Sequence, residues 1–127
     1  MAWLNRDITG AANAGARQLL ELVARRSEEF NAINTATALH RLARHHEQGS
    51  LPKPSEQPAL KQLLARTAEQ LQGEEAECNA RAVSTIAHAI AGLGTRDKEI
   101  TRALVLAAKR RVEGLDRQGV ANTAWAF

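Results

Sequence analysis

Aromatic residues are scarce in this 127-residue chain: tyrosine is absent, and two tryptophans and two phenylalanines make up 3% of it. Hydrophobic residues nevertheless make up 44% of the sequence, an ordinary fraction for a globular protein. Alanine carries much of this apolar content. Because alanine favours helices and lets neighbouring helices approach closely, the composition predicts an all-α fold with tight packing.

Cysteine is limited to Cys78, so an intramolecular disulfide is excluded and nothing indicates an oxidising compartment. No apolar run approaches the roughly 20 residues that span a bilayer, so no membrane span is expected. The three prolines fall together, at Pro52, Pro54 and Pro58. Since proline disrupts helices, residues 47–59 are predicted to form an inserted surface loop.

Three segments of the sequence repeat one another. They begin at residues 30, 78 and 115 and read FNAINTATALHRLAR, CNARAVSTIAHAIAG and LDRQGVANTAWAF. Near the start, each carries a short polar side chain, at Asn31, Asn79 and Asp116. Further along, each carries a ring, at His40, His88 and Trp125. Internal repetition of this kind is typical of stacked helical hairpins, which bind more often than they catalyse.

Apolar residues at helical spacing predict paired helices around these segments. A first helix is expected over residues 16–29, and a second from Asn31 or Asn34 to about His46. The chain is therefore predicted to be one domain, a short α-solenoid of antiparallel helical hairpins with about two and a half repeats. Its expected parts are a lead-in that caps the first hairpin (1–15), repeat 1 (16–46), the proline-rich loop (47–59), repeat 2 (60–94) and a truncated repeat 3 (95–127).

The last segment carries the most specific signature, VANTAWAF over residues 120–127. It resembles the octotricopeptide repeat (OPR) family, whose repeat pairs two antiparallel helices and whose second helix carries a motif close to Leu-Ala-Asn-Thr-Leu-Trp-Ala-Leu-Ala. The other two copies match more loosely, with histidine at the tryptophan position and Thr37 or Thr85 at the asparagine position. Similar repeats occur in the related RAP and FAST-kinase-like organellar proteins.

The resemblance implies a module that binds single-stranded RNA in a mitochondrion or chloroplast and acts in organellar RNA metabolism or translation. An alternative stays open: a non-catalytic protein-binding scaffold, or a structural subunit of a large organellar complex such as a ribosome, in contact with ribosomal RNA and other protein subunits. The first eight residues lack the apolar core of a signal peptide, and Asp7 is atypical of transit peptides. An imported protein would therefore contain this chain as a mature or trimmed piece.

Each predicted second helix carries a triplet at i, i+4 and i+7, so its members share one side of the helix. The triplets are Ile33, Thr37 and His40; Arg81, Thr85 and His88; and Gln118, Asn122 and Trp125. Hydroxyl and amide groups followed by a ring suit an unstacked base, by hydrogen bonds to its edge and stacking on its face.

Positions that vary between the copies are the better candidates for RNA contact, because a reader of different bases needs variation. The candidates along the triplets are Ile33, Asn34, Thr37, Arg81, Thr85, Gln118 and Asn122. The residues that the copies share are interpreted as structural: Asn31, His40, Asn79, His88, Asp116 and Trp125.

Basic residues gather early, at Arg17, Arg25, Arg26, Arg41 and Arg44, and late in the chain. From residue 96 onward seven basic residues stand against four acidic ones, an excess equal to the net charge of +3 of the whole chain. A basic surface suits phosphate contact, although a solvated helix face is the simpler explanation for any single arginine. The candidates for phosphate contact are Arg41, Arg44, Lys109, Arg110, Arg111 and Arg117.

Motifs for catalysis are missing from the sequence: it has no nucleophile elbow, no phosphate-binding glycine loop and no paired-carboxylate arrangement above chance. His45, His46 and Glu47 are adjacent, so on a helix they face different directions and are not expected to bind a metal together. We therefore expect a protein that is not an enzyme and that holds no cofactor or metal.

Overall fold

The computed structural model describes residues 2–73, 80–95 and 97–111. These residues form six α-helices and contain no β-strand, which confirms the predicted all-α class. The helices are α1 (Ala2–Ala14), α2 (Ala16–Arg26), α3 (Ala32–Glu47), α4 (Pro58–Gln72), α5 (Ala80–Leu93) and α6 (Lys98–Arg111). No helix of this part of the chain is long and apolar enough to cross a membrane.

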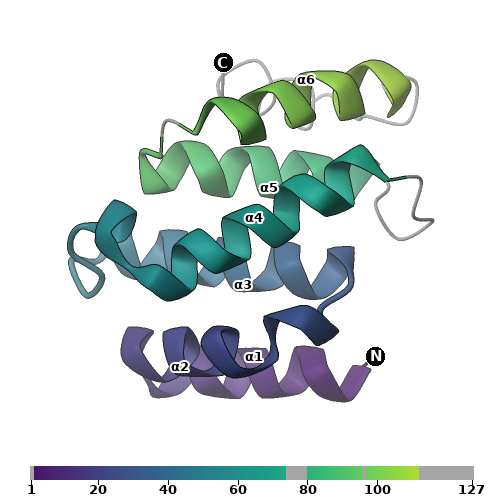
Figure 1. The fold of residues 1–127 in the computed structure, drawn as a ribbon. Helices are drawn as coiled ribbons and strands as arrows, with labels where there is room; N and C mark the ends of the chain where they lie inside the picture. The colour runs from purple at the N-terminus through teal and green to yellow at the C-terminus, as the bar shows by residue number, and fades with distance from the viewer. Residues whose placement is uncertain (1, 74–79, 96, 112–127) are drawn as a thin grey trace.

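The helices pack in two layers (Figure 1). In the first layer α3 lies between α1 and α5, and in the second layer α4 lies between α2 and α6. Successive helices run in alternate directions, so the helices within one layer are parallel (Figure 1). The buried face of each helix carries leucine, isoleucine, valine or alanine at helical spacing, and burial of these faces between the layers forms one core.

The start of α3 is fixed by both of the asparagines that the sequence offers as caps. Asn31 Oδ1 accepts a hydrogen bond from the backbone N–H of Asn34 at 2.9 Å, and Asn34 Oδ1 accepts one from the N–H of Asn31 at 3.0 Å. This reciprocal pair satisfies two backbone donors that the first turn leaves unpaired. Asn31 is the cap, as expected for a structural residue of the repeat.

Residues 1–15, predicted only as a lead-in that caps the first hairpin, include the 13-residue helix α1. Burial of Leu4, Ile8 and Ala12 outweighs the cost of Gly10 within this helix. Gly15 alone separates α1 from α2. Its φ of 154° is open to few other residues, and a Cβ there would lie 2.5 Å from Gln18 Oε1.

The loop in the proline-rich stretch is shorter than the predicted loop over residues 47–59. Glu47 ends α3, Pro54–Glu56 form a 3₁₀ turn, and Pro58 and Ala59 belong to α4. Proline is accepted in a first helical turn because its missing N–H has no partner to lose there. The loop is held to α3 by His46, whose Nδ1 lies 2.8 Å from the carbonyl oxygen of Leu51.

The connection between α2 and α3 is held by side chains of α4. The carbonyl oxygen of Phe30 accepts hydrogen bonds from Arg66 Nη2 at 3.0 Å and from Gln70 Nε2 at 2.9 Å. Phe30 and Gln70 are both buried. Because a buried carbonyl without a partner is costly, these bonds tie the two layers together at this point.

Two buried threonines differ in whether their hydroxyl is paired. Thr35 and Thr67 are both 0% exposed. Thr67 Oγ1 donates to the Leu63 carbonyl at 2.7 Å, whereas Thr35 Oγ1 has no hydrogen-bond partner among the described residues. A buried unpaired hydroxyl costs free energy that an apolar group of the same shape does not.

We expect Thr35→Val to increase the free energy of unfolding by about 1 kcal/mol relative to the matched substitution Thr67→Val. Urea denaturation followed by circular dichroism measures both variants against the wild type. If Thr35→Val destabilises the protein as much as Thr67→Val does, the hydroxyl of Thr35 has a partner and the interpretation is wrong.

Candidate functional site

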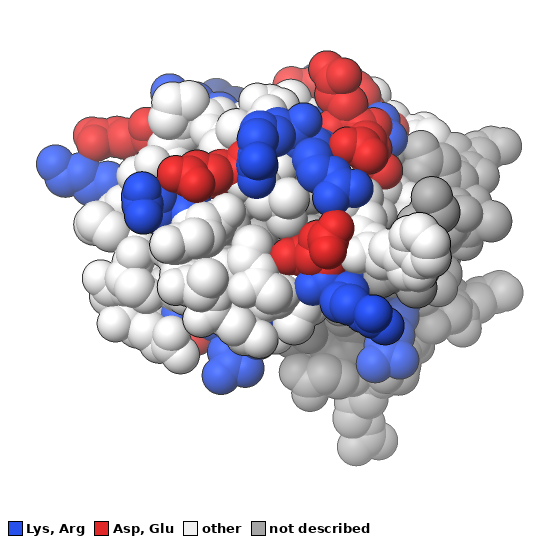
Figure 2. Space-filling model, turned by 90° about the horizontal axis from the view of Figure 1, so that it is seen from below, with Lys and Arg blue, Asp and Glu red and all other residues white. Residues whose placement is uncertain are grey.

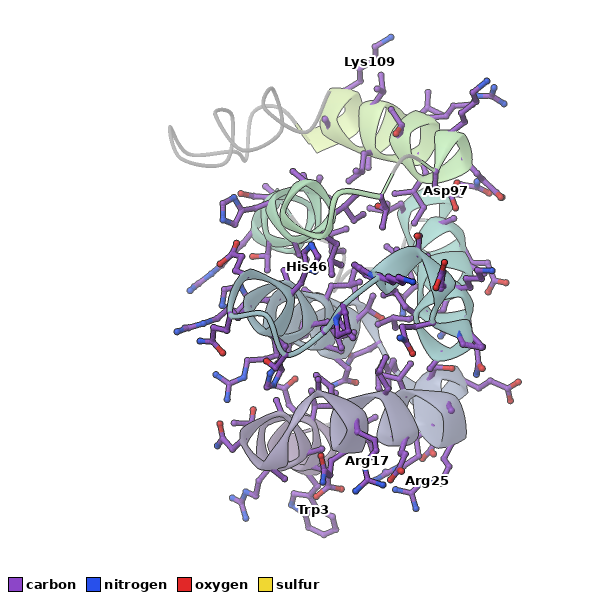
Figure 3. All side chains as sticks on the ribbon, turned by 90° about the vertical axis from the view of Figure 1, so that its left-hand side faces the viewer. Trp3, Arg17, Arg25, His46, Asp97 and Lys109 are labelled. Carbon is purple, nitrogen blue, oxygen red and sulfur yellow. The ribbon has the colours of Figure 1, made fainter. Side chains whose placement is uncertain are left out.

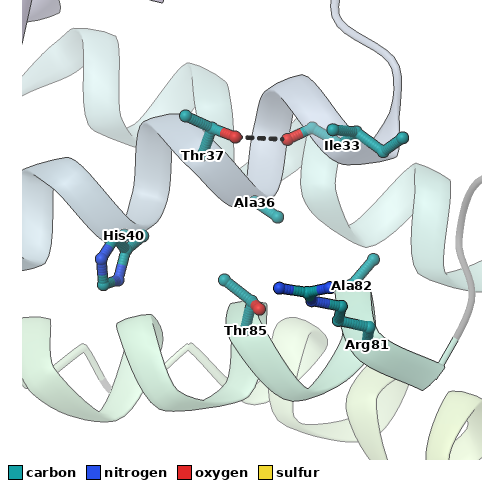
Figure 4. A pocket seen from close by; sticks show the side chains of 7 residues that line it. All are labelled: Ile33, Ala36, Thr37, His40, Arg81, Ala82 and Thr85. Carbon is teal, nitrogen blue, oxygen red and sulfur yellow. Dashed lines mark hydrogen bonds between the residues drawn. The ribbon is translucent and has the colours of Figure 1, made fainter. Parts of the chain in front are cut away.

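A groove of about 480 Å³ lies at the surface of the first layer, between α3 and α5 (Figure 4). This volume falls within the roughly 300–1,000 Å³ of small-ligand pockets. It is lined by Ile33, Ala36, Thr37 and His40 of α3 and by Arg81, Ala82 and Thr85 of α5. The structure therefore brings together members of the first two triplets that the sequence repeat predicts.

The floor of the groove is apolar and shallow because Ala36 and Ala82, each 6% exposed, carry only a methyl group. Ile33 adds an apolar side chain that is 48% exposed. The hydroxyl of Thr37 donates to the carbonyl oxygen of Ile33 at 3.0 Å (Figure 4), which leaves its oxygen able to accept a hydrogen bond. Thr85, half-buried, lies on the opposite side.

Positive charge in the groove comes from Arg81, in the first turn of α5. Its side chain is exposed and extends along the groove toward Thr85 (Figure 4). Among the described residues no carboxylate forms an ion pair with it. The guanidinium is thus available to an anionic ligand as far as these residues are concerned.

His40 lies at one end of the groove, with its ring between the two helices (Figure 4). Partial burial lowers its pKa from the ordinary value of 6.5, and the nearby positive charges of Arg44, Arg41 and His88 lower it further, against a smaller opposite effect of Glu47. His40 and His88, interpreted from the sequence as structural, are both exposed. The two residues lie on α3 and α5, which pack side by side and parallel.

Asn34 was expected to contact RNA, and the structure corrects this expectation. Its side chain is 2% exposed, because both its oxygen and its amide nitrogen are used inside the protein. The oxygen caps the N–H of Asn31, and Nδ2 donates to Asn5 Oδ1 of α1 at 3.4 Å. Asn34 is therefore a structural residue of the helix start.

The predicted basic residues whose side chains the structure describes do not form one surface. Arg41 and Arg44 lie on α3, in the layer of the groove, whereas Lys109 lies on α6 in the second layer and points away from the fold (Figure 3). Arg110 and Arg111 belong to α6, but their side chains lie outside the described part. Also outside the described residues are Asn79, Asp116, Arg117, Gln118, Asn122 and Trp125.

The early arginines of α2 lie at the end of the stack formed by α1 and α2, where positive and negative side chains are mixed (Figure 2). Arg17 pairs with Glu21 at 3.5 Å, and Arg26 pairs with Asp7 at 2.9 Å and Glu29 at 3.2 Å. This end face is therefore not a concentrated basic patch.

His45 and His46 hold the end of α3 in place. His45 Nε2 lies 2.8 Å from the Ala12 carbonyl oxygen, which links α3 to α1, and His46 bonds to the loop at Leu51. Among the described residues, no three His, Cys, Asp or Glu side chains are grouped so that they could hold a metal ion.

Sequence reasoning assigned no site residue to α1, yet this helix carries a second hollow of about 540 Å³ lined by Asn5, Arg6, Thr9, Gly10 and Asn13. The sequence feature that could have indicated this hollow is the spacing of three residues of α1. Arg6, Gly10 and Asn13 stand at i, i+4 and i+7, as the other triplets do.

We expect His40 to titrate below 6.5 and Arg44→Ala to raise its pKa, because Arg44 is the strongest of the nearby charges. NMR titration of the imidazole resonances measures both. Arg25→Ala, on α2, is the matched control and should leave the His40 titration unchanged. Since the folded state disfavours the charged ring, the contribution of His40 to stability is lost as the pH falls below 6.5 toward its folded-state value. A titration at or above 6.5 would contradict the geometry.

Comparisons of the chain with protein-family models, with curated proteins and with solved structures find no match. The functional argument therefore rests on the groove and on the residues that line it.

Proposed function

We propose that the chain is a short α-solenoid of antiparallel helical hairpins that binds single-stranded RNA, as its resemblance to the OPR family implies. The groove between α3 and α5 is the proposed base-binding site. The observation that carries the proposal is the convergence of Ile33, Thr37, His40, Arg81 and Thr85 in one open groove. The repeat pattern predicts Ile33, Thr37, Arg81 and Thr85 as RNA contacts, whereas His40 is predicted as a structural residue and joins the site because it lines the same groove.

The lining of the groove matches the parts of an unpaired nucleotide. Ala36, Ala82 and Ile33 offer apolar contact to the face of a base, and His40 offers a ring for stacking. The oxygens of Thr37 and Thr85 can accept hydrogen bonds from a base edge. Arg81 supplies the charge for an adjacent phosphate. Because base edges and faces are accessible together only in an unstacked strand, single-stranded RNA is the proposed ligand.

The arrangement of the helices supports the solenoid. The predicted repeats 1 and 2 correspond to the helix pairs α2 with α3 and α4 with α5, and equivalent helices of the two pairs lie side by side and parallel. In a stack of this kind, equivalent side chains fall in rows along one face. Action in a mitochondrion or chloroplast is proposed from the resemblance alone, and the scaffold or ribosomal-subunit role is the competing outcome of the test.

We expect Arg81→Ala to weaken binding of a labelled single-stranded RNA pool about tenfold, through loss of one charge-assisted contact. Fluorescence anisotropy across a salt series measures the affinity. Log affinity decreases as log salt concentration rises, and the magnitude of this slope should decrease by about 0.7 for one lost phosphate contact. Thr85→Val should weaken binding with the slope unchanged, since it removes no charge.

Arg102→Ala is the matched control, because Arg102 is an exposed arginine on α6 in the second layer. It should lower the affinity much less than Arg81→Ala. Equal losses from both would mean that the effect is one of net charge and that the groove is not the binding site. If the wild type shows no saturable binding at about 50 mM salt, where phosphate contacts are strong, the RNA proposal fails and the scaffold role is favoured.

A further inference from the structure

The seam between α1 and α3 contains a hollow of about 240 Å³, half the volume of the groove. It is lined by Ala12 and Asn13 of α1 and by Arg41, Arg44, His45 and Gln48 of α3. Arg41 Nη2 donates to Asn13 Oδ1, so its guanidinium is held across the seam rather than extended into solvent. The bond from His45 to Ala12 fixes the other side of the hollow.

The two arginines of the seam have no acidic partner among the described residues. No carboxylate of this part of the chain forms an ion pair with Arg41 or Arg44. Glu47, the acidic residue at the end of α3, lies toward α5: its Oε1 is 3.3 Å from where a Cβ of Gly92 would stand. Asp7, the acidic residue of α1, is bound by Arg26.

The seam and the groove flank α3 on its two sides: His40 lines the groove toward α5, and Arg41 and Arg44, one and four residues further along α3, line the seam toward α1. The positive charges of Arg44 and Arg41 also lower the pKa of His40. A strand that leaves the groove past His40 toward α1 therefore meets two guanidinium groups next.

We infer that the seam between α1 and α3 is a phosphate-binding site for the backbone of the same RNA strand, with Arg41 and Arg44 as the ligands and Asn13 as the residue that positions Arg41. The inference rests on the proposed function. It gives α1 a role in binding, and the hollow around Arg6 and Thr9 extends the same face beyond the seam.

Two exposed positions test the site. Arg44→Gln removes one phosphate ligand. The magnitude of the slope of log affinity against log salt, measured with a labelled single-stranded RNA oligonucleotide, should decrease by about 0.7. Asn13→Asp places a carboxylate beside Arg41, which would neutralise its guanidinium and repel a phosphate, so we expect a loss of affinity at least as large as that of Arg44→Gln. Arg102→Gln on α6 is the control for loss of charge, and thermal unfolding of each variant confirms the fold.

The outcomes separate this inference from the proposed function. If Arg81→Ala and Thr85→Val weaken binding while Arg44→Gln and Asn13→Asp keep the wild-type affinity and salt slope, the seam is not a phosphate site and the groove stands. If Arg44→Gln lowers the slope no more than Arg102→Gln, the effect is one of net charge and the inference is overturned. If the wild type binds no RNA, the proposed function fails first.

Discussion

Alanine at the contact between α3 and α5 is the constraint on which the site depends. Ala36 and Ala82 are nearly buried and line the groove, while Ala87 and Ala89 are fully covered by the packing of α5. Methyl groups let the two helices pack along their length and leave open space wherever no longer side chain fills it. The groove is therefore a product of the same small residues that hold the first layer together, and its polar lining comes from the neighbouring positions of each helical turn.

Much of the helix pattern could be predicted from the sequence, because apolar periodicity reflects which face is buried. The predicted repeat 2, over residues 60–94, contains α5, and the cap of α6 is Asp97, whose Oδ1 accepts from the N–H groups of Glu99 and Ile100. Helix α1 was underestimated because glycine lowers local helix propensity, whereas burial of its apolar face decides the outcome. Helix propensity is a local property, so it does not show that the apolar face of α1 is buried against α3.

Part of the candidate site could also be predicted, for a related reason. Residues at i, i+4 and i+7 share a helix face whatever the tertiary structure is, so the triplets on α3 and α5 needed only the helices to lie in register. Asn34 was misassigned because sequence alone does not show that both asparagines of a capping box are used. Arg41 and Arg44 were predicted as phosphate contacts, but the part of Asn13 was missed because it depends on a contact with Arg41, and these two residues are far apart in the chain and follow no repeat.

The single residue between α1 and α2 has a consequence for the width of the seam. With only Gly15 as the connection, no flexible linker separates these two helices. The φ of 154° at Gly15 is one that residues with a side chain rarely adopt. Because α1 packs on α3 while α2 packs on α4, a substitution at Gly15 would disturb the placement of α1 beside α3, and with it the width of the seam, without altering any residue that lines the seam.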